Sequence, residues 1–165
     1  MWVRSEYAGE LAVLSAWFAA LLPWNVSYVG DVLGGSALFV RFPFFQVRFL
    51  FDTAFGPPVR FLTLPAALDL QRGNPIELAY QVWAAGAVVV ALAVGLSVAY
   101  YLAEDRLDAT LDPVRLMGGL LALGGVVFAV AVVLLATRGF GGIPVPVGVV
   151  LMLALAGSLL GVERT

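Results

Sequence analysis

Residues 39–51 read FVRFPFFQVRFLF, and the fold depends on the structure that this stretch adopts. Val-Arg-Phe occurs on either side of Pro43 and again at residues 59–61. The prolines at 43, 57 and 58 forbid one long helix, while Val, Phe and Leu favour extended structure. PFFQ, residues 43–46, can form a hairpin turn, and a symmetric turn there places Arg41 directly across from Arg48. Because like charges in that position repel, such a hairpin needs an anion, or Asp31 or Asp52, between the two arginines.

The chain around this stretch is strongly apolar. Of its 165 residues 62% are hydrophobic and only 12% are charged, with a mean hydropathy of +0.99. Since about a quarter of the residues of a soluble domain are charged, this composition is typical of an integral membrane protein. The length fits one domain, residues 1–165.

Three residue types are missing from the sequence: cysteine, histidine and lysine. Without Cys and His the chain lacks thiolate chemistry, the commonest general base and the commonest metal ligand, and it contains no phosphate-binding glycine motif. We therefore expect no enzyme activity, no cofactor and no metal. The nine basic residues are all arginine and the isoelectric point is about 4.9, which favours a halophilic archaeal source and offers no basic surface for nucleic acid.

Four apolar segments, at about residues 7–24, 77–103, 114–137 and 143–162, have the composition of membrane spans. Roughly 20 apolar residues at ~1.5 Å each cross a hydrocarbon core of about 30 Å. The first segment is the shortest and carries Glu10. The sequence therefore predicts an all-α membrane protein with a four-transmembrane-helix bundle and a partly extended or β interfacial loop between helices 1 and 2.

Helix-start signals accompany these segments. NPIE, residues 74–77, matches a capping box, and Asp112-Pro113 matches an N-cap followed by a first-turn proline. Pro144 and Pro146 fit the first turn of the last segment. Aromatic residues are expected to mark the membrane surfaces: Tyr7, Trp24, Tyr28, Tyr80, Trp83, Tyr100 and Tyr101.

Small residues follow one face of the second segment at a spacing of four: Ala87, Ala91, Gly95 and Ala99. Such a strip lets helix backbones approach closely in lipid. It predicts either packing within the bundle or an interface with a second copy or a membrane protein partner.

The interfacial cap, about residues 27–73, is where the three Val-Arg-Phe arginines are expected to act. A guanidinium at the bilayer centre costs at least about 2.5 kcal/mol. At headgroup depth, phenylalanines enter the acyl boundary and arginines reach anionic lipid phosphate. The predicted lipid- or partner-binding residues are Arg41, Arg48, Arg60, Phe42, Phe44, Phe45 and Phe49. In the alternative interpretation this cap is a small β-unit outside the membrane whose phenylalanines pack on one another.

Two functions follow from these features. The first is a non-enzymatic accessory or scaffold subunit that binds anionic lipid or a partner. The second is a small channel or transporter in which Glu6 and Glu10, a possible proton or ion relay, line an entry with Arg138. Arg4 precedes the first span and Asp31 follows it, which favours cytoplasmic termini in a multi-pass cell-membrane protein.

MWVRSEYAGELAVLSAWFAALLPW at residues 1–24, VRFPFFQVRFLF at 40–51 and the closing apolar segments together resemble a family of short haloarchaeal membrane proteins with a domain of unknown function. The similarity covers most of the chain, and VRFPFFQ is its most specific part. The resemblance implies a small multi-spanning protein, and it implies no activity, catalytic residue or cofactor.

Overall fold

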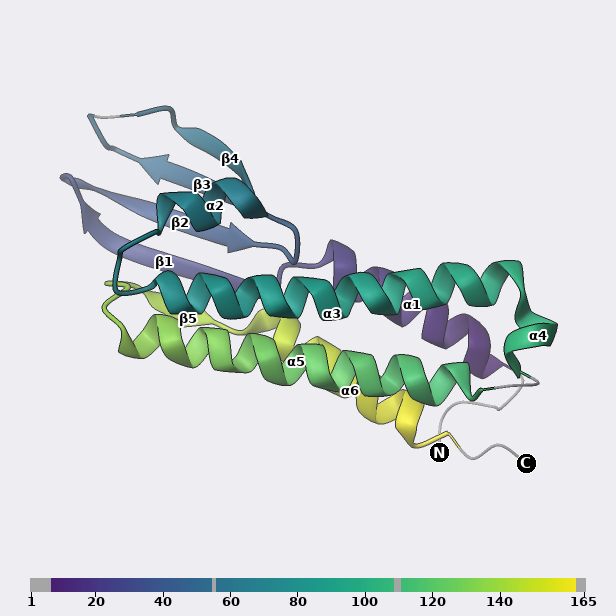
Figure 1. Cartoon of the computed structure of the whole chain (residues 1–165). Coiled ribbons are helices and arrows are strands. Elements are labelled where there is room, and N and C mark those ends of the chain that lie inside the picture. The colour runs from purple at the N-terminus through teal and green to yellow at the C-terminus, as the bar shows by residue number, and fades with distance from the viewer. Residues whose placement is uncertain (1–6, 55, 109–110, 163–165) are drawn as a thin grey trace.

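The computed structural model describes residues 7–54, 56–108 and 111–162, and Figure 1 shows that this part combines a helical layer with a β-sheet. Its helices are α1 (Ala8–Leu21), α2 (Leu64–Leu70), α3 (Glu77–Leu102), α4 (Glu104–Asp108), α5 (Pro113–Thr137) and α6 (Val147–Leu160). Its strands are β1 (Asn25–Val32), β2 (Gly35–Arg41), β3 (Phe45–Phe51), β4 (Val59–Thr63) and β5 (Ile143–Val145). The long helices α3 and α5 lie side by side, and the sheet stands beside the first part of α3 (Figure 1).

The prediction of an all-α, four-transmembrane-helix bundle is wrong, because the fold is mixed α/β. Two helices, α3 with 26 residues and α5 with 25, are long and apolar enough to cross a membrane by length and composition. The helices α1 and α6 have 14 residues each and therefore rise by only about 21 Å.

Strands replace part of both shortened segments. The first predicted span, 7–24, stops being helical at Leu21, because the chain turns to an extended conformation at Leu22, before Pro23. In the last predicted span, 143–162, residues Ile143–Val145 form β5, and the helix begins at Val147. The multi-pass prediction with four spans therefore has no support.

The predicted interfacial loop, 27–73, contains most of a five-stranded sheet. Its strand order is β4-β3-β2-β1-β5, and every neighbouring pair is antiparallel. At one edge β5 contains Pro144, and at the other edge β4 follows Pro57 and Pro58. Proline lacks a backbone donor, so the β5 edge is a poor template for pairing with another strand, whereas β4 itself contains no proline.

Glycines on α3 and α5 let the helices approach one another closely. A Cβ added at Gly86 would lie 2.4 Å from the Phe128 ring, and one at Gly125 would lie 2.8 Å from Leu153 on α6. The ring of Phe128 stacks on Trp24, with centroids 5.0 Å apart and planes 9° from parallel. This cluster joins α3 and α5 to the residue that precedes β1.

Most of the predicted small-residue strip on α3 faces outward. Ala87 is buried, whereas Ala91, Gly95 and Ala99 are exposed. No heavy atom lies within 4 Å of a Cβ built at Gly95. These three residues therefore do not pack within the described part of the chain.

One of the two predicted helix caps is confirmed. Asp112 Oδ1 accepts a hydrogen bond from Arg115 N at 3.1 Å, with Pro113 in the first turn of α5. At residues 74–77 no side-chain cap forms, because α3 begins only at Glu77.

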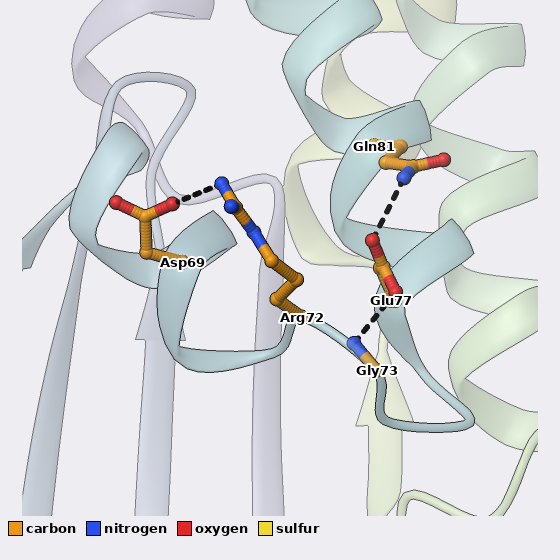
Figure 2. A network of polar contacts seen from close by, with 5 residues as sticks. All are labelled: Asp69, Arg72, Gly73, Glu77 and Gln81. Carbon is orange, nitrogen blue, oxygen red and sulfur yellow. Dashed lines mark hydrogen bonds and ion pairs between the residues drawn. The ribbon is translucent and has the colours of Figure 1, made fainter.

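The polar side chains at this start of α3 bond to the α2–α3 connection instead. Glu77 Oε2 accepts from Gly73 N at 2.7 Å and Glu77 Oε1 accepts from Gln81 Nε2 at 3.1 Å. Arg72 pairs with Asp69 at 2.7 Å in the same connection (Figure 2). The connection between α2 and α3 is thus a polar, exposed segment whose charges are engaged locally.

Candidate functional site

The strand register assigns the side chains of the sheet to two faces with opposite polarity. Residues that pair directly project on the same side of a sheet, and side chains alternate along each strand. The inner face, which α2 and α3 cover, contains the arginines and amides of the sheet together with apolar residues: Asn25, Ser27, Val29, Ala37, Phe39, Arg41, Gln46, Arg48, Leu50, Arg60, Leu62 and Pro144. The outer face consists of Val26, Tyr28, Gly30, Ser36, Leu38, Val40, Phe45, Val47, Phe49, Phe51, Val59, Phe61, Thr63, Ile143 and Val145. Apart from Gly30, Ser36 and Thr63, the residues of this outer face are apolar or aromatic, and each residue of the face is exposed or half-buried.

Arg41 lies at the centre of the contact between the inner face and α3, with 0% of its surface exposed. Its Nη1 donates to Asn25 Oδ1 at 2.7 Å and to Ser27 Oγ at 2.8 Å. Its Nε and Nη2 donate to the Tyr80 hydroxyl at 3.4 and 3.3 Å. Among the described residues no carboxylate forms an ion pair with Arg41.

Aromatic rings enclose the same guanidinium. The Arg41 Cζ lies 4.7 Å from the centroid of Phe140, 5.1 Å from that of Phe39 and 5.6 Å from that of Tyr80. Burial lowers the pKa of Arg41, while the Tyr80 oxygen acts in the opposite direction. A guanidinium nevertheless keeps its proton in proteins. Arg41 is therefore a buried cation that neutral oxygens and ring faces stabilise.

The polar contacts of Arg41 extend to the remaining inner-face residues. The Tyr80 hydroxyl donates to Gln46 Oε1 at 3.0 Å, and Ser27 Oγ donates to Asn25 Oδ1 at 2.6 Å. Next to this cluster, Trp83 Nε1 donates to the carbonyl oxygens of Phe42 and Pro43 at 3.0 and 2.9 Å. Tyr80 and Trp83, both predicted to mark a membrane surface, thus attach α3 to the sheet.

The hairpin turn lies at the predicted place with a different register. Phe42 N donates to Phe45 O at 2.9 Å, so the turn is formed by Pro43 and Phe44 alone. Arg41 consequently pairs with Gln46. A four-residue turn would instead pair it with Arg48.

Arg48 and Arg60 form a pair of their own on the inner face. Arg48 pairs with Phe39 on one side and with Arg60 of β4 on the other. Arg48 is half-buried, and Arg60 is exposed at the edge of the sheet. The Nε of Arg48 is buried and has no hydrogen-bond partner in the described part of the chain.

The predicted lipid-binding residues are therefore divided between the two faces. Arg41, Arg48 and Arg60 are on the inner face, and of these Arg41 is shielded from any ligand outside the fold. Phe45 and Phe49 are on the outer face. Phe42 and Phe44 lie at the turn, where the ring of Phe42 stacks on that of Phe45 with centroids 4.4 Å apart.

The residues predicted to line a channel entry are not brought together. Glu6 lies outside the described residues, and Glu10 is exposed in the first turn of α1. Arg138 is exposed at the end of α5, next to the sheet and far from the start of α1 (Figure 1). Within residues 7–54, 56–108 and 111–162, no group of three or more acidic side chains is placed to hold a metal ion.

Sequence reasoning missed the neutral residues that hold Arg41. Asn25 and Ser27 are both fully buried, although Asn25-Val26-Ser27 matches a glycosylation sequon. The alternation of polar and apolar residues in NVSY, residues 25–28, was the available signal, because it is the period of a strand with two different faces.

No curated protein matches this chain. A family model described as a family of unknown function, DUF7549, matches residues 1–164. Since the match covers nearly the whole sequence, the chain belongs to the DUF7549 family.

Proposed function

We propose that this protein is a non-enzymatic membrane protein with an accessory or scaffold role, anchored by α3 and α5, whose sheet contacts lipid. The observation that supports it is the polarity of the sheet. Its helix-covered inner face contains Asn25, Arg41 and Gln46, whereas its uncovered outer face carries no charged residue and is apolar except at Ser36 and Thr63. A sheet that has one face in water normally has the opposite arrangement.

The size of the outer face favours lipid over water as its surroundings. Tyr28 is 53% exposed, Phe61 59% and Ile143 71%. Soluble monomers rarely expose a contiguous apolar patch larger than a few hundred Å². Each Å² that lipid covers contributes roughly 25 cal/mol, so a patch of this kind gives substantial free energy of membrane binding.

The contacts of α3 support a position of the sheet at one surface of the bilayer. Trp83 bonds to the β2–β3 turn, and from Trp83 to Leu102 the helix rises by about 29 Å at ~1.5 Å per residue. That length matches a hydrocarbon core of about 30 Å. The sheet then lies beside the segment of α3 that enters the headgroup region, where its open edges retain access to water, as unpaired strand edges require.

Lipid acyl chains are the occupant that we assign to the outer face. Two helices of membrane length run next to the sheet, and Pro144 interrupts the β5 edge, which disfavours pairing of that edge with a strand of a second copy. The proposal keeps cytoplasmic termini, which place the sheet on the extracellular side, and a halophilic source.

Single cysteines test the proposal directly, because the chain contains none. We would place a fluorophore at Phe61→Cys on the outer face and, as a control, at Ala54→Cys, an exposed residue of the β3–β4 loop. In bilayer nanodiscs, lipids that carry a quencher on the acyl chain should quench the label at position 61 several-fold more strongly than the label at position 54. Equal quenching at the two positions refutes the proposal. Excimer formation between labels at position 61 without lipid quenching identifies a second copy as the occupant and also refutes it.

The same control variant tests the orientation. A membrane-impermeant maleimide added to intact cells should label Ala54→Cys if the sheet is extracellular. Protection of position 54 until the cells are lysed would place the sheet in the cytoplasm.

No contact in the described residues favours the alternative of a small channel or transporter. Glu10 and Arg138 lie at opposite ends of the helices, and a cavity between α1 and α6 measures about 10 Å³ and is lined by apolar residues such as Phe18 and Met152. Such a volume is at the lower limit for one water molecule.

A further inference from the structure

We infer that Arg48 and Arg60 form a binding site for a phosphate oxyanion at the β4 edge of the inner face. The inference deepens the proposed function, because a phospholipid headgroup is one source of such an anion and free phosphate is the other. It concerns the opposite face of the sheet from the lipid-facing surface, so the two proposals can fail separately.

The strand register brings the two arginines together. Arg48 and Arg60 are direct partners in the β3–β4 ladder, and directly opposed residues have Cβ atoms about 4.5–5.5 Å apart. Two like charges in this position repel each other. A bound anion between them would convert that repulsion into two attractive contacts.

No acidic group of the described chain neutralises this pair. Neither Arg48 nor Arg60 forms an ion pair or a side-chain hydrogen bond within residues 7–54, 56–108 and 111–162. By contrast, Arg72 and Arg115 pair with Asp69 and Asp112. The carboxylate of Asp69, on neighbouring α2, is engaged at 2.7 Å by Arg72. The positive charge of the Arg48–Arg60 pair is therefore open to a ligand.

The burial of Arg48 adds a specific donor to this charge. Its Nε is buried without an acceptor, although the residue as a whole is only half-buried. A buried donor of a charged group that lacks an acceptor is unfavourable, and a ligand oxygen would satisfy it after a shift of the Arg48 side chain that exposes this atom. Arg41 differs, because its Nε and both terminal nitrogens already have oxygen acceptors. Arg48 thus retains an unused edge of its guanidinium, and the exposed Arg60 retains all of its donors.

The donor pattern selects a phosphate group over a single carboxylate. A guanidinium binds two oxygens of a phosphate through two parallel hydrogen bonds. With two guanidinium groups facing one position, a ligand with three or more acceptor oxygens can satisfy both, which a carboxylate with two oxygens does less well.

The level of the pair along α3 makes both sources accessible. Arg48 pairs with Phe39, which lies two residues before Arg41 and thus about 7 Å nearer the start of β2. Tyr80, which holds Arg41, is about 4.5 Å from the beginning of α3 at Glu77. The strands that carry the pair, β3 and β4, contact α2, from which the polar connection leads to α3 (Figure 2). A lipid phosphate at the headgroup level and a phosphate from solution can both approach there.

The test uses the full chain in phosphate-free maltoside detergent micelles with inorganic phosphate as one probe. The second probe is phosphatidylglycerol added to the micelles in phosphate-free buffer. The readouts are the thermal unfolding midpoint, Tm, and the apparent affinity from titration. We expect at least one probe to raise Tm, and we expect Arg48→Gln and Arg60→Gln each to weaken its binding by tenfold or more. The matched control is Arg72→Gln, which removes the same charge from an arginine that is already paired, and it should change binding less than twofold.

Arg60→Glu is a second variant, for which the inference predicts a gain in stability. Its carboxylate would lie opposite Arg48 and replace the anion within the chain. We expect a higher Tm than the wild type without phosphate, and no further increase when either probe is added. A lower Tm without phosphate, together with an undiminished response to the probe, would contradict the inference.

The outcomes separate the two sources and the two proposals. An effect of phosphatidylglycerol alone identifies the lipid phosphodiester, and an effect of inorganic phosphate identifies a free phosphate ligand. The inference is overturned if neither probe acts on the wild type, or if the Arg48 and Arg60 variants respond as the wild type does. Loss of lipid quenching at position 61 with an intact phosphate response removes the proposed function and leaves this site standing.

Discussion

Replacing Tyr80 with Phe tests whether the inner face of the sheet is a dry polar contact. Tyr80 is 2% exposed. Its hydroxyl accepts two hydrogen bonds from Arg41 and donates one to Gln46. The substitution Tyr80→Phe removes one oxygen atom and leaves the ring, which contacts Trp83 edge-on at 5.3 Å, in place. Its effect therefore reports on the hydrogen bonds and not on packing.

The expected loss follows from the geometry. The two bonds from Arg41, at 3.3 and 3.4 Å, are longer than ordinary hydrogen bonds, so we assign about 1 kcal/mol to both together, below the usual 1.5–3 kcal/mol for a charged donor. The Gln46 oxygen, in a residue that is 2% exposed, loses its partner at a cost of about 1–3 kcal/mol. We therefore expect Tyr80→Phe to lower the free energy of unfolding by about 2–4 kcal/mol.

The measurement is equilibrium unfolding in mild detergent, followed by circular dichroism. Tyr101→Phe makes the same chemical change at a residue that is 81% exposed, and it should change the free energy of unfolding by less than about 0.5 kcal/mol. In an Arg41→Met background the loss from Tyr80→Phe should shrink by about 1 kcal/mol, because the charged donor is gone. Equal losses for Tyr80→Phe and Tyr101→Phe would show that water reaches Arg41, and the account of a buried cation would be wrong.

Three further substitutions test the packing and the helix cap, with Tm in the same detergent as the measurement. Gly148→Ala should lower stability by about 1–3 kcal/mol, because its Cβ would lie 2.4 Å from Pro23 O and 2.6 Å from Trp24 Cα, which are backbone atoms. Gly95→Ala should raise stability by up to about 1 kcal/mol, since no heavy atom lies within 4 Å of the added Cβ and alanine favours a helix. A loss at Gly95 would instead indicate a partner packed on this strip. Asp112→Ala should lower stability by about 1 kcal/mol by removing the acceptor of Arg115 N, and no change would mean that this cap is not formed.

The two long helices could be predicted from sequence because local signals determine them. Their apolar runs of 26 and 25 residues exceed the usual length of a strand, which seldom passes ten residues. Asp112 and Pro113 also define the start of α5 through contacts within one turn. For such elements the neighbouring residues contain the necessary information.

The sheet could not be predicted in full, because distant residues complete it. Pro144 is compatible both with the first turn of a helix and with an edge strand. What decides is its pairing with Ser27, far away in the sequence, which no local pattern reveals. Because the chain enters β1 after α1 and forms β5 before α6, both helices are shorter than predicted, and the four-helix prediction is wrong.

Part of the candidate site could be predicted, because any hairpin turn with an even number of residues keeps the same side chains on a common face. A four-residue turn and the observed two-residue turn both put Arg41 and Arg48 on one face, because the two registers differ by two positions. The observed β2–β3 register separates these two arginines, and the β3–β4 register places Arg48 opposite Arg60. The common face could thus be inferred from the spacing, whereas the partner of each arginine could not.

A period of two identifies a strand and does not identify which face is buried. In water, Val26 and Tyr28 would turn inward and Asn25 would face the solvent, whereas the structure has the reverse. α3 supplies Tyr80 and Trp83 as polar partners on the inner side, and under the proposed function lipid covers the outer side. Together these two conditions would make the reverse arrangement favourable. In water this arrangement of the sheet would expose the outer face and still bury the Arg41 guanidinium, and each of these would cost free energy. The apolar composition and the strand period therefore have to be interpreted together, because the medium determines which set of alternating residues faces the helices.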